Sequence, residues 1–172
     1  MALRLLYMAL MSLGLLLGRT PVRLVPATLG GPSGVALTAE EARFVALVNT
    51  ERTARGLVPL TVAPLLVKVA REKSTELYTL HYWGHESPVV EKRTAMRRVL
   101  YYLPHPPKTM TVGENLYSCD RVLVDEGHQA LMNSPTHRHN ILKPEYRYLG
   151  VGCFTAPDGR FWTTEIFLDI AW

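Results

Sequence analysis

The sequence has no apolar run long enough for a membrane span, no internal repeat and no low-complexity tract. Its most apolar stretch, from Leu5 to Leu17, is shorter than the roughly 20 residues that a membrane-spanning helix needs. The stretch follows Arg4, and a basic residue before a short apolar core is typical of a secretory signal. We therefore expect residues 1–27 to form a signal peptide or an uncleaved N-terminal anchor. The rest of the chain is then expected to be secreted or held in the cell envelope.

Cysteine is scarce, with Cys119 and Cys153 the only two in the chain. An even count in an exported chain favours pairing. On the chain-entropy model, closing the loop between them could contribute about 3–4 kcal/mol. The alternative is two buried free thiols, and we expect the disulfide.

The charges form no surface typical of nucleic-acid binding. The net charge is +4 and the charged residues make up 20% of the chain, with both signs mixed. The densest basic stretch, from Lys92 to Arg98, has no accompanying aromatic platform and is better explained as a solvated helix face. With 48% apolar residues, the 172-residue chain suits one globular domain and no nucleic-acid partner.

The elements expected from the sequence are helices first and a hairpin last. Residues 28–37 are rich in glycine and proline and are expected to be a linker, followed by one domain over residues 38–172. Thr38 and Glu41 have the spacing of a capping box that begins a helix ending near Gly56. Further helices are expected from Pro64, over 90–102 and over 121–133, with an extended segment over 112–119. Two β-rich runs around residues 157–159 predict a hairpin, so the fold class is α+β.

Three polar clusters interrupt this apolar pattern. They are "WGHESP" with His85, "VGENLY" with Glu114 and "NSPTHR" with His137. Two imidazoles and a carboxylate could bind a divalent metal such as zinc, or act as general acid and base. No cluster is specific alone, because no second histidine stands four residues after His85 and a lone histidine is commonly a cap or core residue.

The order and spacing of the clusters are more specific. "VNTERTARGLVPL", "GHESP", "GEN", "MNSPTHRHNIL" and "YLGVGC" follow one another between residues 48 and 153. This series resembles the bacterial branch of the CAP superfamily, which groups cysteine-rich secretory, antigen 5 and pathogenesis-related-1 proteins and is also called SCP-like. The resemblance covers residues 37–172 and includes Asn49 and Arg52 in the first helix.

The resemblance implies a three-layer α-β-α sandwich with a small, mainly antiparallel sheet and a central cleft lined by histidine and acidic residues. His85, Glu114 and His137 match three positions of that cleft, and Asn115 follows Glu114. The second acid of the family falls near Ser134, so this chain departs from the complete set. The stretch "MNSPTHRHNIL" is expected to be the end of a cleft-lining helix, with His137 turned inward.

Two functions are compatible with this pattern. The first is an exported binding module whose cleft takes a lipophilic ligand, a cell-envelope component, an extracellular protein or a divalent cation at His85 and His137, with no cofactor required. The second is a peptidase-like hydrolase with Ser134 as nucleophile, His137 or His85 as base and Glu114 orienting the base. We favour the binding module, because no oxyanion hole is evident and Ser134 is more simply a turn residue.

Overall fold

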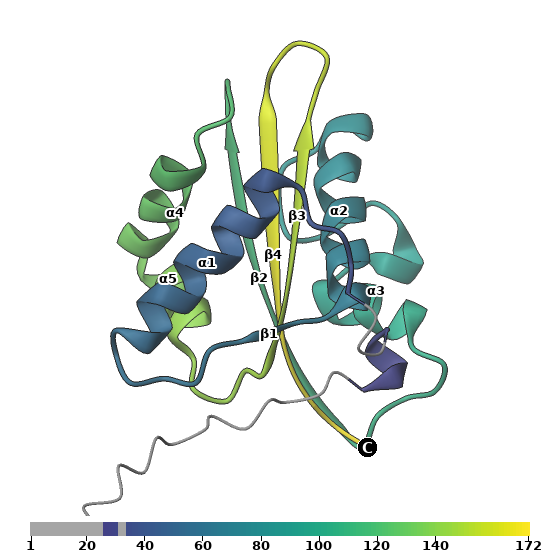
Figure 1. Cartoon of the computed structure of the whole chain (residues 1–172). Coiled ribbons are helices and arrows are strands. Elements are labelled where there is room, and N and C mark those ends of the chain that lie inside the picture. Colours follow the sequence, from purple (N-terminus) through teal and green to yellow (C-terminus); the bar gives the residue numbers. More distant parts are fainter. Residues whose placement is uncertain (1–25, 31–33) are drawn as a thin grey trace, which may run out of the picture.

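The fold is a three-layer α-β-α sandwich, seen in a computed structural model that describes residues 26–30 and 34–172 (Figure 1). The sheet has the order β1-β3-β4-β2; β1 is parallel to β3 and the other pairs are antiparallel. Helices α1, α4 and α5 cover one face, and α2 and α3 cover the other. The strands are β1 (Thr61–Val62), β2 (Thr109–Cys119), β3 (Tyr148–Thr155) and β4 (Phe161–Ala171). The helices are α1 (Ala39–Thr53), α2 (Pro64–Thr79), α3 (Ala95–Tyr102), α4 (Val124–Asn133) and α5 (Pro135–Leu142), with short 3₁₀ turns η1 (Ala27–Leu29) and η2 (Val90–Lys92).

Several predicted elements are confirmed together with the fold class. Thr38 and Glu41 form both hydrogen bonds of the capping box at the start of α1, and Pro64 occupies the first turn of α2. The hairpin between β3 and β4 turns at residues 157–159. None of the helices within the described residues is long and apolar enough to cross a bilayer.

Two helix predictions were wrong in detail. Residues 90–102 do not form one helix: Thr94 is extended and its hydroxyl accepts the Arg97 N–H, which begins α3 anew. The stretch "MNSPTHRHNIL" contains the end of α4 at Asn133, but most of it is a second helix, because Ser134 is extended and Pro135 begins α5. Proline suits this position, since the first turn of a helix leaves its backbone N–H groups unused.

The predicted disulfide is absent. Cys119 and Cys153 are free thiols, because β4 lies between their strands: Cys119 is opposite Phe161 and Cys153 is opposite Thr163. Two strand spacings and an offset of two residues along β4 separate the cysteine Cα atoms by more than about 9–10 Å, whereas a disulfide needs less than about 7 Å.

The predicted boundary segments have different outcomes. The predicted signal peptide or anchor lies almost wholly outside the described residues. In the segment expected to be a linker, Leu29 is fully buried under α2 in the cluster that includes Leu66 and Val69. Packing therefore begins before Thr38.

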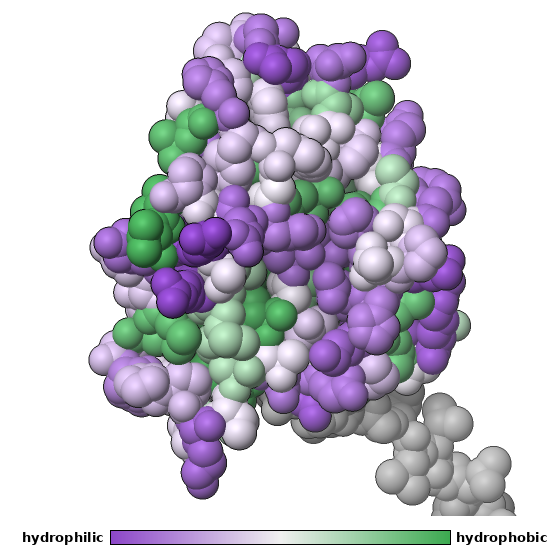
Figure 2. All heavy atoms as spheres, turned by 180° about the vertical axis from the view of Figure 1, so that it is seen from behind, coloured by the Kyte–Doolittle hydropathy of each residue, from purple (hydrophilic) through white to green (hydrophobic). Residues whose placement is uncertain are grey.

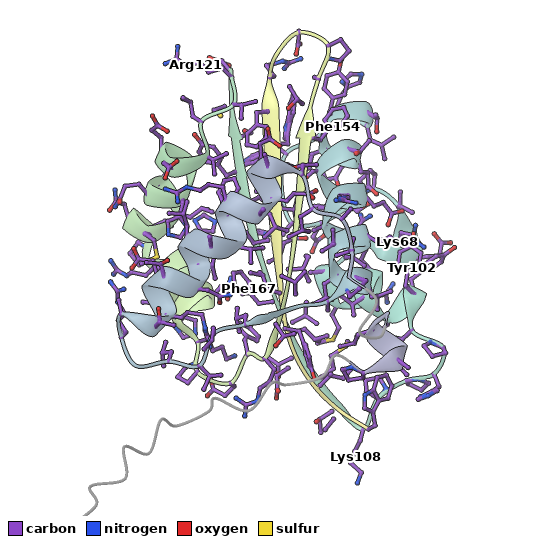
Figure 3. All side chains as sticks on the ribbon, viewed as in Figure 1. Lys68, Tyr102, Lys108, Arg121, Phe154 and Phe167 are labelled. Atoms are coloured by element: carbon purple, nitrogen blue, oxygen red, sulfur yellow. The ribbon has the colours of Figure 1, made fainter. Side chains whose placement is uncertain are left out.

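Two glycines let α2 lie flat against the sheet. Gly150 and Gly152 of β3 face this helix, and a methyl group on either would overlap the backbone of α2 near Leu66 or near Ala70. On the opposite face, Phe167 points from β4 into the hydrophobic core between the sheet and helices α1, α4 and α5 (Figure 3). There its ring stacks on Tyr146.

Two residues of the first-helix signature have structural roles. Asn49 exchanges two hydrogen bonds with the backbone of Leu60. The fully buried Arg52 donates to backbone carbonyls, including those of Ile141 and Lys143. Both residues therefore tie α1 to the chain segments that flank the sheet.

Candidate functional site

The edge strand β2 presents two polar side chains to opposite faces of the sheet. Glu114 is paired with Ile166 and faces the layer of α2 and α3, whereas Asn115 is paired with Glu165 and faces the layer of α1, α4 and α5. Successive strand residues alternate between the faces. The motif Gly-Glu-Asn therefore places one polar side chain on each face of the sheet at its edge strand.

His85 meets Glu114 on the α2 side. The imidazole Nδ1 lies 2.8 Å from Glu114 Oε1. The His85 side chain is 59% exposed and that of Glu114 is 4% exposed. The hydrogen bond to Glu114 raises the pKa of His85, against an opposing effect of burial. With Nδ1 engaged, Nε2 is the nitrogen of His85 that remains available to a ligand.

His137 approaches from the other side of β2. Its backbone carbonyl accepts a hydrogen bond of 3.1 Å from Asn115 Nδ2, which fixes α5 against the strand. Burial lowers the pKa of His137, and the nearby charge of His85 lowers it further. His137 is therefore neutral at neutral pH and lies within electrostatic reach of His85.

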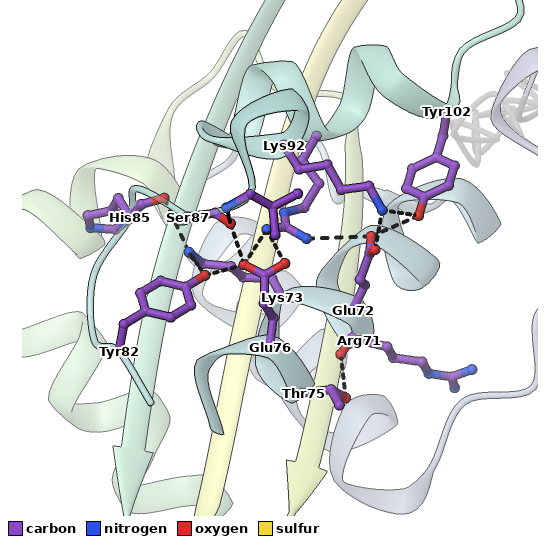
Figure 4. A network of polar contacts seen from close by, with 12 residues as sticks. Arg71, Glu72, Lys73, Thr75, Glu76, Tyr82, His85, Ser87, Lys92 and Tyr102 are labelled. Carbon is purple, nitrogen blue, oxygen red and sulfur yellow. Dashed lines mark hydrogen bonds and ion pairs between the residues drawn. The ribbon is translucent and has the colours of Figure 1, made fainter. Parts of the chain in front are cut away.

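A buried lysine holds the segment that carries His85. Lys73 of α2 is 1% exposed, and its ammonium group donates to the carbonyls of Gly84 at 2.8 Å and His85 at 3.2 Å (Figure 4). It also donates to the Tyr82 hydroxyl at 2.9 Å. Burial lowers the pKa of Lys73, and the charge of Glu114 opposes this shift. Lys73 thus fixes the backbone at His85 from within the core.

Glu76 completes this network beside Lys73. It accepts hydrogen bonds from Tyr82, from Ser87 at 2.6 Å and from Arg98 at 2.8 Å (Figure 4). Burial opposes its ionisation, but these bonds outweigh burial and keep the pKa of Glu76 below its usual value. Because the network contacts both Tyr82 and Ser87, it anchors the His85 segment on each side of the histidine.

A second buried network lies behind His137. Asn115 Nδ2 donates to Glu165 Oε2 at 3.0 Å, and Asn115 Oδ1 accepts from Asn140 Nδ2 at 2.9 Å. Glu165 is fully buried, and its Oε1 has no hydrogen-bond partner within the described residues. Burial raises the pKa of Glu165 to about 7, against the effect of the Asn115 hydrogen bond.

The titration of Glu165 predicts a pH-dependent stability. Its pKa is higher in the folded chain than the ordinary value of 4.5, so the folded state binds more protons between pH 4.5 and about 7. The protonation of Glu165 therefore stabilises the folded state. This stabilisation is fully present below pH 4.5 and is lost as the pH rises through about 7. In the unmodified chain, the free energy of unfolding measured by urea titration should therefore decline between about pH 5 and 8. We expect Glu165→Gln to remove this decline. An unchanged slope in this variant would contradict the assignment.

Ser134 and His139 lie apart from these contacts. In the part of the chain that the structure describes, the Ser134 hydroxyl has a single hydrogen-bond partner, Thr136 Oγ1 at 3.3 Å. No histidine activates this hydroxyl there, so the geometry gives no support to Ser134 as a nucleophile. His139 is exposed on α5.

The groove beside His85 is open and carries several polar side chains. A hollow of about 430 Å³ is lined by side chains that include His85, Glu114, Thr94 and Asn140. Glu114 Oε2 is buried with no partner in residues 26–30 and 34–172. Across the same residues, no group of three or more histidine, cysteine, aspartate or glutamate side chains is close enough to hold a metal. His85 is the one histidine that lines this hollow, so His137 would have to reach a cation here from the other side of β2.

Sequence reasoning missed Lys73, Glu76 and Glu165. The first two lie on the buried side of α2, where a charged residue within an apolar stripe could have indicated a buried partner. Glu165 interrupts the apolar strand "FWTTEIFL" in the same way. That signal indicates a buried charge without identifying its partner.

Comparison with known proteins gives consistent matches. The family model "Cysteine-rich secretory protein family" (CAP) matches residues 45–167. The uncharacterized protein YkwD of Bacillus subtilis is 34% identical over 138 residues, which are 80% of this chain and 50% of YkwD. The chain thus spans about half the length of this curated relative.

Solved structures share the fold. An outer surface protein of Borrelia burgdorferi superposes with a TM-score of 0.68 at 18% identity, covering 79% of this chain and 96% of that protein. An extracellular SCP-domain protein of Bacillus anthracis superposes with a TM-score of 0.60 at 23% identity, covering 81% of this chain and 45% of that protein. With the family model matched from Val45 to Phe167, the chain belongs to the CAP family of cysteine-rich secretory proteins.

Proposed function

We propose that this chain is an exported binding domain whose groove beside β2 holds a divalent cation between His85 and His137, with zinc as the best-suited ion. The N-terminal pattern of a basic residue and a short apolar run supports export. So do the surface and extracellular descriptions of the two structural neighbours.

The hydrogen bond between His85 Nδ1 and Glu114 carries the proposal. A histidine that binds a metal usually donates its other ring N–H to a carboxylate, which fixes the ring and its tautomer. Glu114 is placed for that role, so Nε2 of His85 would be the ligand atom. A histidine must be neutral to bind zinc, and the lowered pKa of His137 favours its neutral form. Its ring would supply the second nitrogen ligand.

The unpartnered Glu114 carboxylate oxygen in this groove favours a cation or a polar cell-envelope component over a lipophilic ligand. An apolar molecule in the groove would leave Glu114 Oε2 without a partner, which costs free energy. Two imidazoles leave coordination positions open to water or to a ligand atom, so we expect weak and exchangeable binding.

Zinc calorimetry tests the proposal. The unmodified chain should bind one zinc ion, and His85→Ala and His137→Ala should each weaken binding by about tenfold or more. Glu114→Gln should weaken binding by about tenfold while the stoichiometry stays at one, because the amide orients the ring less firmly.

The matched control is His139→Ala, which removes an exposed histidine from the same helix as His137. Its zinc affinity should equal that of the unmodified chain. Equal affinity in His85→Ala and His137→Ala as well would place the metal elsewhere and refute the proposal.

A further inference from the structure

A second hollow, of about 340 Å³, lies where the end of α2 meets the first residues of β4. Its walls are mainly aromatic and include Tyr78, Tyr82, Trp83 and Trp162. It shares neither His85 nor Glu114 with the groove described above. It is therefore a separate feature of the molecule.

The inner wall of this hollow is rigid. Tyr78 packs against Trp162 with ring centroids 5.3 Å apart and against Phe154 at 5.4 Å. The Arg160 guanidinium lies over both Tyr78 and Trp162, at 5.8 Å and 5.3 Å from the ring centroids. Such contacts fix the rings before any ligand arrives.

The outer wall is different, because Trp83 is 57% exposed. A tryptophan left in water beside a preformed hollow is a surface on which a flat apolar face can stack. On the face shown in Figure 2, the hydrophobic side chains form small patches separated by polar ones. This arrangement suits a narrow ligand better than a protein partner.

Several polar groups around the hollow can donate hydrogen bonds. Ser118 contributes a hydroxyl, Trp83 an indole N–H and Arg160 its terminal N–H groups. Arg160 is already neutralised by Asp158, whose Oδ2 accepts its Nε–H at 2.8 Å. An uncharged ligand rich in acceptors would use these donors, whereas a purely apolar ligand would strip them of water without compensation.

A pyranose ring with an acetamido group has these properties. One face of the ring consists of C–H groups that stack on an indole, and the acetamido carbonyl and ring hydroxyls accept hydrogen bonds. We propose that the aromatic hollow is a binding subsite for a linear chain of N-acetylated amino sugars, with one sugar ring stacked on Trp83.

The shape of the surrounding surface suits a chain rather than a single sugar. A third hollow, of about 350 Å³, shares Tyr82 with the aromatic hollow and shares Glu86 with the groove at His85. Glu114 and Ser118 lie on the same face of β2, about 13 Å apart along the strand. That length is greater than one sugar ring, so it suits linked rings.

The test uses the β-1,4-linked hexamer of N-acetylglucosamine and the full chain. Calorimetry should detect binding, and the tryptophan emission should change on titration. Trp83→Ala should lower the affinity by about tenfold or more, in line with the loss of a stacked ring. Arg160→Met should lower it as well, by removing the donors while keeping the length of the side chain.

The matched control is Trp172→Ala, which removes another partly exposed tryptophan, one that packs against His105 far along the chain from Trp83. Its affinity for the hexamer should be unchanged. Absence of binding at millimolar hexamer, or equal affinity in Trp83→Ala, would overturn the proposal. Zinc titration of the same variants distinguishes this failure from failure of the cation site, because Trp83→Ala should retain zinc binding.

Discussion

Replacing Glu76 by glutamine should lower the free energy of unfolding by about 3–5 kcal/mol, because it leaves the charge of Arg98 buried with too little compensation. Arg98 is 1% exposed and donates to both carboxylate oxygens of Glu76 at 2.8 Å. The remaining carboxylate, Glu72, is 3.5 Å from Arg98 and is also engaged by Lys92. Urea titration at about pH 7, where carboxylates are ionised, measures the loss.

The control for Glu76→Gln is Glu86→Gln on the neighbouring segment. Glu86 pairs with Arg93, but both side chains are more than half exposed. Exposed ion pairs contribute about 0–1 kcal/mol, so this variant should unfold almost as the unmodified chain does. If both variants lost a similar free energy of unfolding, burial would not be the reason that the Glu76 network stabilises the fold.

Substituting alanine for Gly152 should also destabilise the fold, by about 3 kcal/mol or more. The added methyl group would overlap the backbone of Ala70 and Arg71, which cannot move aside as a flexible side chain could. The helix α2 would have to shift away from β3, against which it packs at Gly150 and Gly152. Thermal unfolding followed by circular dichroism measures the effect.

Gly34→Ala provides the comparison for Gly152→Ala. No atom lies within 4 Å of the position that its methyl group would take. We expect a change within about 0.5 kcal/mol. If Gly152→Ala were equally mild, the close packing of α2 on β3 would be incorrect.

Local features of the sequence predicted most elements. The capping box at Thr38, the proline at the start of α2 and the turn at residues 157–159 depend on neighbours within a few positions, and all three are confirmed. The same kind of signal misled at Ser134 and Pro135. A Ser-Pro pair is compatible with a loop or with the start of a helix, and only the packing of α5 against β2 decides between them.

Long-range features were harder to predict. The disulfide prediction was wrong because the number of cysteines carries no information on strand order. In the sheet, β4 separates Cys119 from Cys153. The resemblance to a family indicated His85, Glu114 and His137, but not what holds them. Lys73 contacts the carbonyls of residues 11 and 12 positions away, and Asn115 contacts Glu165 50 positions away.

The contacts around the candidate site act together. Lys73 and Glu76 hold the His85 segment from the core, Glu114 orients the imidazole, and Asn115 holds α5 so that His137 lies on the other side of the same strand. On the proposed function, the two histidines share one cation, and Glu114 lies outside the coordination sphere.

Anomalous diffraction from a zinc-soaked crystal tests that claim most directly. We expect one peak at bonding distance from His85 Nε2 and from a ring nitrogen of His137, while Glu114 remains hydrogen-bonded to His85 Nδ1. A peak bonded to Glu114 or to His85 Nδ1, or a peak only at His139 or another surface histidine, would contradict it.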